Sequence, residues 1–139
     1  MITVVAALIE KDDKIFIAKR ATGKSAFGKW EFPGGKVESN ETEENAIERE
    51  IKEEFDVIIK AQKFIINNIC QTPERVIDLR LYECKYLTGE FQLHDHFEYE
   101  WVEIDKLLEY DLADADIPLA KYVKENYEDG LRKIKTRFN

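Results

Sequence analysis

The sequence predicts an α+β fold, in which strands and helices pack in layers around a core. Three observations predict it. Runs rich in Val and Ile, separated by short polar turns, are typical of strands. One stretch between them has apolar residues at intervals of three and four, the period of a helix with one buried stripe. A second helical stretch follows the last strand-like run, so strands and helices do not alternate regularly.

Composition limits the size of the protein and its partners. The 139 residues, 44% of them hydrophobic, suffice for one core, and we expect a single domain over residues 1–139. With 21 basic and 29 acidic residues the net charge is -8, which disfavours direct binding to duplex nucleic acid. The two cysteines lack CxxC spacing and fit a reducing, cytoplasmic compartment. The apolar run at 2–9 is too short for a membrane span and lacks the basic leader of a signal peptide.

A hairpin, a loop and a helix are predicted in the N-terminal half. The hairpin strands are 2–9 and 15–18, joined by a polar turn at 11–14, and the loop is 22–29. The Pro-Gly-Gly segment at 33–35 ends regular structure. A helix is predicted to run to Phe55 with Thr42 as its N-cap. Its buried stripe consists of Ala46, Ile47, Ile51 and Phe55.

Three strands and two helices are predicted in the C-terminal half. The strands are 57–66, 76–86 and 99–104. Asp105 is expected to cap a short helix at 106–109. The last helix is expected at about 117–130, with Pro118 in its first turn, where a missing N–H is tolerated.

Three glutamates on the first predicted helix are the most informative feature. Glu50, Glu53 and Glu54 are related by i to i+3 and i to i+4, so they project from one helix face beside the buried stripe. Like charges so placed repel unless a cation lies among them, and oxygen-only ligands select hard divalent ions such as Mg²⁺ or Mn²⁺. The alternative is a solvated acidic helix face. The glycine pair at 34–35 and the arginine within the helix favour the metal site.

The spacing of these residues resembles the Nudix box, the signature of the Nudix hydrolases. Gly35 is followed after five residues by Glu41, and after seven more by the run Arg49-Glu50-Ile51-Lys52-Glu53-Glu54. The resemblance implies the Nudix fold, a mixed β-sheet sandwiched between helices (α/β/α). One position departs from the box, because Asp56 stands where glycine is usual. Asp56 follows the predicted helix end, so we expect it to have a positive φ in the left-handed conformation.

The resemblance also implies a hydrolase whose divalent cations, Mg²⁺ or in its place Mn²⁺, activate a water that attacks a phosphorus of a diphosphate linkage. The implied metal ligands are the carbonyl of Gly34 and the carboxylates of Glu50, Glu53 and Glu54. Residues with an implied part in catalysis are Glu53, Glu50, Arg49 and Asp95. Arg49 is expected to pair with Glu41 and hold the helix against its loop.

The water-activating base is expected to be Glu53, which would then be both ligand and base. The loop at 94–98 offers alternatives, with Asp95 as the first choice and Glu98 as the second. The two histidines of this loop, His94 and His96, have no third partner for a metal site and are expected to be solvated.

Further segments resemble the MutT-type branch of the family. They are residues 16–21, 28–38, 101–102 and 115–118. The resemblance implies the following substrate contacts: Arg20 with the nucleotide, Lys36 with a phosphate, Asp116 with the base, and Phe32 and Arg75 near the base. An ionised carboxylate only accepts hydrogen bonds, so Asp116 suits a base with a donor edge, such as cytosine or 8-oxoguanine. A plain helix N-cap is the alternative role of Asp116.

We therefore expect a metal-dependent nucleoside triphosphate pyrophosphohydrolase that acts on 8-oxo-dGTP or on CTP-like pyrimidine nucleotides. A link to DNA repair would then run through sanitation of the nucleotide pool. The alternatives are a Nudix hydrolase of another nucleoside diphosphate derivative and a non-catalytic nucleotide-sensing Nudix domain. The sequence leaves open whether the protein is a monomer or a homodimer.

Overall fold

The computed structural model describes residues 1–21, 28–94, 96–128 and 133–134. Most of the predicted loop at 22–29 therefore lies outside the described residues. The strands are β1 Ile2–Lys11, β2 Lys14–Arg20, β3 Trp30–Glu31, β4 Gly34–Lys36, β5 Ile58–Gln71, β6 Val76–Thr88, β7 His96–Glu103, β8 Tyr127–Glu128 and β9 Lys133–Ile134. The α-helices are α1 Glu43–Phe55 and α2 Ile117–Asn126, and the 3₁₀ helices are η1 Ile104–Glu109 and η2 Asp114–Asp116.

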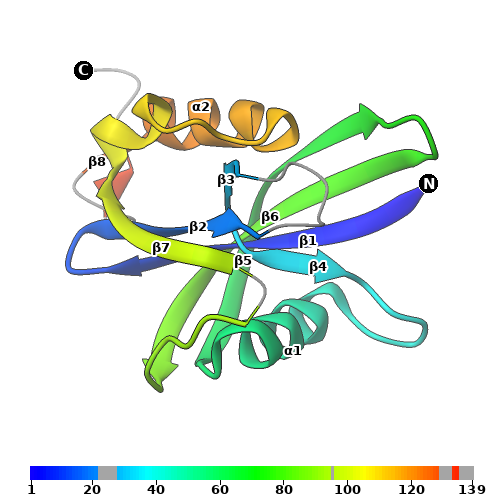
Figure 1. The fold of residues 1–139 in the computed structure, drawn as a ribbon, viewed down its shortest axis with the longest axis horizontal. Helices are drawn as coiled ribbons and strands as arrows, with labels where there is room; N and C mark the ends of the chain where they lie inside the picture. Colours follow the sequence, from blue (N-terminus) through cyan, green and yellow to red (C-terminus); the bar gives the residue numbers. More distant parts are fainter. Residues whose placement is uncertain (22–27, 95, 129–132, 135–139) are drawn as a thin grey trace.

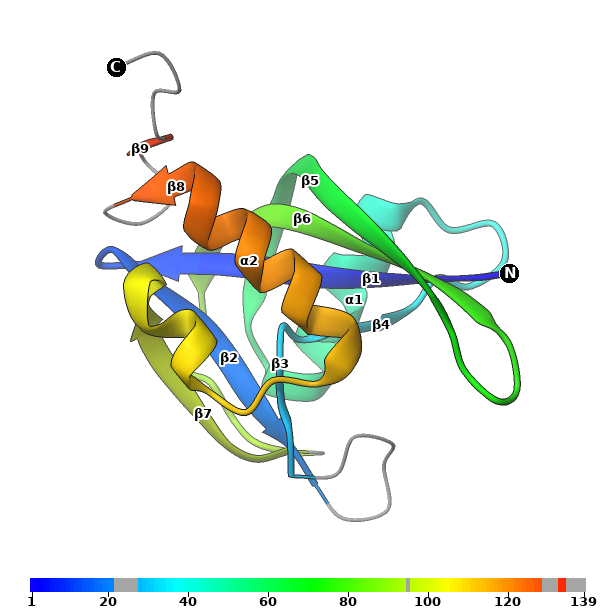
Figure 2. The ribbon, with the colours of Figure 1, turned by 90° about the horizontal axis from the view of Figure 1, so that it is seen from above.

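One mixed sheet carries the fold of the described part of the chain. Its strands follow the order β3-β2-β1-β6-β5, with β4 paired to β1 and β7 paired to β2. The β1–β6 pair is parallel, whereas β1–β2 and β5–β6 are antiparallel. Helices α1 and α2 lie on opposite faces of this sheet (Figure 1), and Figure 2 shows α2 crossing over it. The predicted arrangement of a mixed sheet between helices is thus confirmed.

Two hydrophobic clusters, one on each face of the sheet, follow from the alternation of side chains along the strands. In β2, Ile15 and Ile17 pack with α2, whereas Phe16 belongs to the cluster under α1. The predicted helical stripe, with Ile47 and Phe55 fully buried, covers that second cluster. The hydrophobic period therefore fixes which face of the sheet α1 covers.

Local signals at turns and caps are confirmed. The β1–β2 hairpin turns at Asp12 and Asp13, both with positive φ, as two-residue hairpin turns that match the strand twist require. Thr42 caps α1, because its hydroxyl accepts a hydrogen bond from the Asn45 N–H at 3.1 Å. After α1, Asp56 has φ 60° and ψ 32°, the predicted left-handed conformation.

Four predicted boundaries in the C-terminal half are wrong. The strand predicted at 57–66 runs to Gln71, because its antiparallel pairing with β6 continues as far as Val76. Strand β7 begins at His96 and not at 99, because pairing with β2 extends to Arg20. Helix η1 begins at Ile104, and Asp105 lies inside its first turn instead of capping it. Helix α2 ends at Asn126, since Tyr127 is extended and enters the short β8–β9 pair. No helix in the described residues is long and apolar enough to span a membrane.

Candidate active site

The Gly-Gly segment packs closely between strand β1 and helix α1. Strand β4 pairs with β1, where Gly34 lies opposite Ala6 and Gly35 opposite Val5. A Cβ on Gly34 would stand 1.9 Å from the Val5 carbonyl oxygen, and one on Gly35 would stand 2.3 Å from the Cδ of Glu50. Gly34 therefore requires glycine, because its neighbours are backbone atoms, whereas a Cβ at Gly35 would have to displace the Glu50 side chain. The loop backbone thus lies directly against a carboxylate of α1.

Arg49 ties this loop to the acidic face of α1. Its guanidinium donates to both carboxylate oxygens of Glu41, at 2.7 and 3.0 Å, which is the pairing expected from the sequence. It also donates to the Lys36 carbonyl at 3.1 Å and to Glu50 at 2.9 Å, with Glu53 at 3.3 Å. The hydrogen bonds from Arg49 lower the pKa of Glu41 to about 2. Arg49 is thus both the loop anchor and the cation nearest to two of the predicted metal ligands.

The three helix carboxylates share one helix face but have different surroundings. Glu54 is largely buried, and burial, followed by the neighbouring charges of Glu50 and Glu31, raises its pKa to about 8. By contrast, the Glu53 side chain is 59% exposed and is turned toward Arg49. Within the described residues, no three acidic, histidine or cysteine side chains converge on a common point as a ready metal site. The structure brings Glu50 and Glu54 together and holds Glu53 aside.

A chain of buried polar groups that the sequence did not predict lies behind Glu54. Arg20 Nε donates to Glu31 at 2.8 Å, and the other oxygen of Glu31 lies 2.8 Å from His96 Nε2. The His96 side chain is only 4% exposed, so the expectation of a solvated His96 is wrong. A sequence signal did exist, since aromatic residues alternate at 97, 99 and 101 and so extend the strand pattern back to this histidine.

A cavity of about 160 Å³ opens beside the Gly-Gly segment. Its polar lining comes from Arg20, Glu31 and Asp116, and Phe32 lies among its apolar residues. Asp116 is 5% exposed, and its carboxylate accepts a hydrogen bond from the Phe32 N–H at 2.9 Å. Burial, together with the charge of Glu31, raises the pKa of Asp116 to about 7. Although Asp116 directly precedes α2, its side chain makes no capping hydrogen bond, so the alternative of a plain N-cap is wrong.

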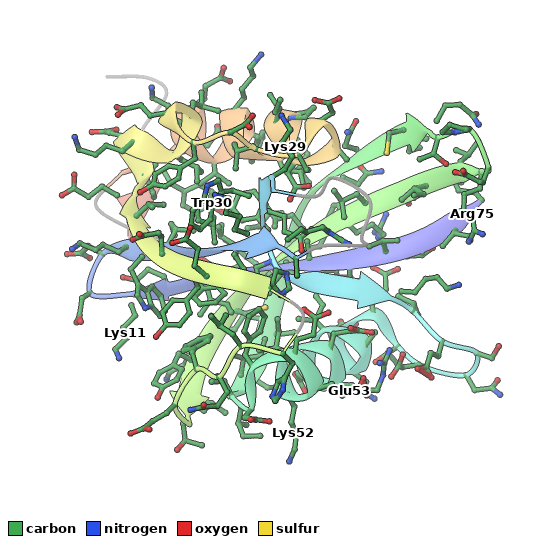
Figure 3. The ribbon with its side chains drawn as sticks, in the orientation of Figure 1. Lys11, Lys29, Trp30, Lys52, Glu53 and Arg75 are labelled. Carbon is green, nitrogen blue, oxygen red and sulfur yellow. The ribbon has the colours of Figure 1, made fainter. Side chains whose placement is uncertain are left out.

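The remaining predicted site residues do not line this cavity or lie outside the described residues. Lys36 is exposed beside it on β4, and Arg75 is exposed at the end of the β5–β6 hairpin. Arg75 is not among the described residues that line the cavity, and Figure 3 shows it far from Glu53 on α1. Glu98, the second choice for a base, is exposed and pairs with Lys19 at 3.7 Å. Asp95, the first choice, lies outside the described residues.

Comparisons with known proteins agree with this geometry. The model of the NUDIX domain family matches residues 1–123. A relative named CTP pyrophosphohydrolase, from Escherichia coli (strain K12), is 38% identical over 119 residues, which cover 86% of this chain and 88% of the relative. An 8-oxo-dGTP diphosphatase from Proteus vulgaris is 36% identical over 75 residues, covering 54% of this chain and 67% of that protein.

A solved structure with the same fold is the solution structure of the E. coli ORF135 protein. It superposes with a TM-score of 0.82 at 36% identity, and the match covers 90% of this chain and 89% of that one. The family model spans most of the chain, including the glycine pair, Arg49 and the three helix glutamates. This chain belongs to the Nudix family of hydrolases.

Proposed function

We propose that this protein hydrolyses nucleoside triphosphates to the nucleoside monophosphate and pyrophosphate. The observation that carries the proposal is the position of the cavity, which is lined by Asp116 at one place and by the Gly-Gly segment at another. A base held at Asp116 would direct its phosphates toward Gly35, whose backbone touches Glu50. The relatives named as CTP pyrophosphohydrolase and 8-oxo-dGTP diphosphatase support the same reaction class.

The donor set fits a hard divalent cation, which Nudix hydrolases generally use. Glu50 and Glu54 lie together on one helix face and supply carboxylate oxygens, which are the ligands that hard divalent cations prefer. Glu53 is exposed, so a side-chain rotation away from Arg49 would bring a third carboxylate. The residues that would hold Mg²⁺, or Mn²⁺ in its place, are Glu50, Glu53, Glu54 and the carbonyl of Gly34. A cation bound there would lower the pKa of a water molecule and offset the charge of the leaving pyrophosphate.

The protein's own groups would orient the substrate and accept a proton. Arg20, which lines the cavity with the Gly-Gly segment, and Lys36, which follows that segment, would supply positive charge to the phosphates. The exposed carboxylate of Glu53 would accept the proton of the attacking water, whose oxygen forms a bond to phosphorus as the bond to the leaving oxygen breaks. Arg49 would keep the loop against α1 through its pair with Glu41 while Glu53 turns from its 3.3 Å contact with Arg49 toward the cation site.

The cavity supports a preference for a base that presents a hydrogen-bond donor. Its volume of about 160 Å³ is small, so the cavity suits a heterocyclic base and not a whole nucleotide. One oxygen of Asp116 already accepts from the Phe32 N–H, which leaves the other for the base. Cytosine and 8-oxoguanine both offer donors to such an oxygen.

A panel of normal and oxidised nucleoside triphosphates, assayed for pyrophosphate release, tests this proposal. We expect release with CTP or 8-oxo-dGTP above the other nucleotides, and an Asp116→Ala variant with a raised KM or lost base discrimination but unchanged cation affinity. Equal activity on all bases in both proteins would remove the role of Asp116. Turnover of a sugar nucleotide or dinucleotide instead would favour another diphosphate, and nucleotide binding without turnover would favour a sensing domain.

A further inference from the structure

The contacts of the buried His96 ring indicate that this residue does more than fill space in the core. Its ring lies between two acids, with Glu31 from β3 on one side and Glu54 from α1 on the other. It also stacks on Phe55, with the ring centroids 5.2 Å apart. The imidazole therefore connects the cavity wall to a helix carboxylate of the cation site.

Glu31 determines which ring nitrogen faces Glu54. One oxygen of Glu31 accepts from Arg20 Nε, and the other is 2.8 Å from His96 Nε2. A carboxylate only accepts hydrogen bonds, so the hydrogen of the second contact belongs to Nε2. The nitrogen that faces Glu54 is consequently Nδ1.

Nδ1 of His96 and Oε2 of Glu54 are an incomplete pair. They stand 3.9 Å apart, and both are buried without a hydrogen-bond partner in the described chain. Buried polar atoms in folded proteins almost always have a partner. A shift of about 1 Å would bring the two atoms to hydrogen-bond distance. The pair is thus one small side-chain movement away from satisfying both atoms.

We propose that His96, oriented by Glu31, is a positioning residue for Glu54. In the working site a hydrogen bond joins Nδ1 and Oε2, and its hydrogen is a proton taken up from solvent in addition to the one that Nε2 donates to Glu31. This bond fixes the inner oxygen of Glu54 and leaves its outer oxygen to face Glu50 and the cation. Groups behind a ligating carboxylate commonly change metal affinity about 10- to 100-fold when they are lost. This role of His96 rests on the proposed function in one respect, namely that Glu54 is a ligand of the divalent cation.

Two substitutions separate this role from simple packing. In His96→Asn the amide nitrogen is bonded to Cγ, as Nδ1 is in histidine, so a polar atom still faces Glu54. In His96→Gln the amide lies one bond farther out, nearer to the position of Nε2, so contact with Glu31 is kept and the group beside Glu54 is lost. His94→Gln is the matched control, since the His94 side chain is 49% exposed and pairs with Asp56 at the surface.

The readout is the dissociation constant of Mn²⁺ alone, measured by electron paramagnetic resonance of the free ion, together with kcat, KM and Tm. We expect His96→Gln to weaken Mn²⁺ binding about 10- to 100-fold and to lower kcat with little change in KM. His96→Asn is expected to stay within about threefold of the native protein, and His94→Gln to match it. Equal Mn²⁺ affinity in the native and His96→Gln proteins would overturn the proposal. So would an equal loss of Mn²⁺ affinity in the Gln and Asn variants that parallels their loss of Tm.

Imidazole ¹⁵N resonances of the native protein test the same idea without any substitution that affects folding. We expect His96 to carry hydrogen on Nε2, and its Nδ1 resonance to shift when Mg²⁺ is added without nucleotide. A hydrogen only on Nδ1, or a resonance that Mg²⁺ leaves unchanged, would refute the positioning role. A protein that binds Mn²⁺ with the expected variant pattern but releases no pyrophosphate would contradict the proposed function and leave the role of His96 standing.

Discussion

Asp116 is a buried acid beside the cavity, and replacing it with asparagine should change the stability of the protein in a pH-dependent way. Its pKa is raised from 3.8 to about 7 by burial and by Glu31, partly offset by the Phe32 N–H and Arg20. Cys70 is the other titratable group that interacts with it. In Asp116→Asn the amide oxygen still accepts from the Phe32 N–H, while the ionisation is removed.

The sign of the effect follows from the two pKa values. The unfolded chain releases the proton of Asp116 near pH 4, whereas the folded chain keeps it until about pH 7, so native stability falls as the pH rises between them. A rise of about 3 pKa units, from 3.8 to about 7, corresponds to on the order of 4 kcal/mol. The asparagine variant avoids this loss, so its advantage over the native protein should grow by up to about 4 kcal/mol from pH 4 to pH 8.

Urea unfolding of the native and variant proteins at several pH values measures this difference, because the titrating groups that do not interact with Asp116 contribute equally to both proteins. Asp114→Asn is the matched control, since Asp114 is exposed two residues away, and its stability difference should not vary with pH in this way. A difference between Asp116→Asn and the native protein that stays flat from pH 4 to pH 8 would refute the argument. It would mean that Asp116 is ionised in the folded protein at no cost.

Other substitutions test the local geometry. Gly35→Ala should keep the fold but displace the flexible Glu50 side chain, which lowers kcat at least about tenfold. Gly34→Ala should unfold the protein, because its Cβ would stand 1.9 Å from a backbone oxygen. Similar circular dichroism melting curves for the two variants would contradict this difference. Asp56→Gly should raise Tm, because glycine adopts a φ of 60° without strain. The variant also loses the exposed pair with His94, so the gain in the free energy of unfolding should stay below about 1 kcal/mol. A fall in Tm would show that this pair outweighs the strain.

The parts of the fold predicted from sequence are those determined by neighbouring residues. The period of α1, its Thr42 cap and the positive φ of Asp56 depend on residues within a turn or two of each other. The pairing of Arg49 with Glu41 was also predicted, since the two are close in the chain. The further contacts of Arg49 with Glu50 and Glu53 depend on side-chain rotamers, which a pattern of charges does not specify.

The parts that were missed depend on contacts between distant segments. His96 is buried because β7 pairs with β2 as far as Arg20, and it meets Glu31 because β3 pairs with the other edge of β2. Likewise Asp116 bonds to the Phe32 N–H, 84 residues away, instead of capping the helix that follows it. The alternation of aromatic residues at 97, 99 and 101 could have extended the strand to His96, but no local signal says which strands pair or that Asp116 meets Phe32. The acidic helix face was therefore predicted from sequence, and the pairing of Glu31 with His96 behind it was not.

Pyrophosphate release from the preferred nucleoside triphosphate, measured with Mg²⁺ and with excess chelator, tests the central claim most directly. We expect turnover that requires Mg²⁺ and that falls at least about a hundredfold in a folded Glu53→Gln variant. Turnover in the presence of chelator, or full turnover by Glu53→Gln, would contradict it.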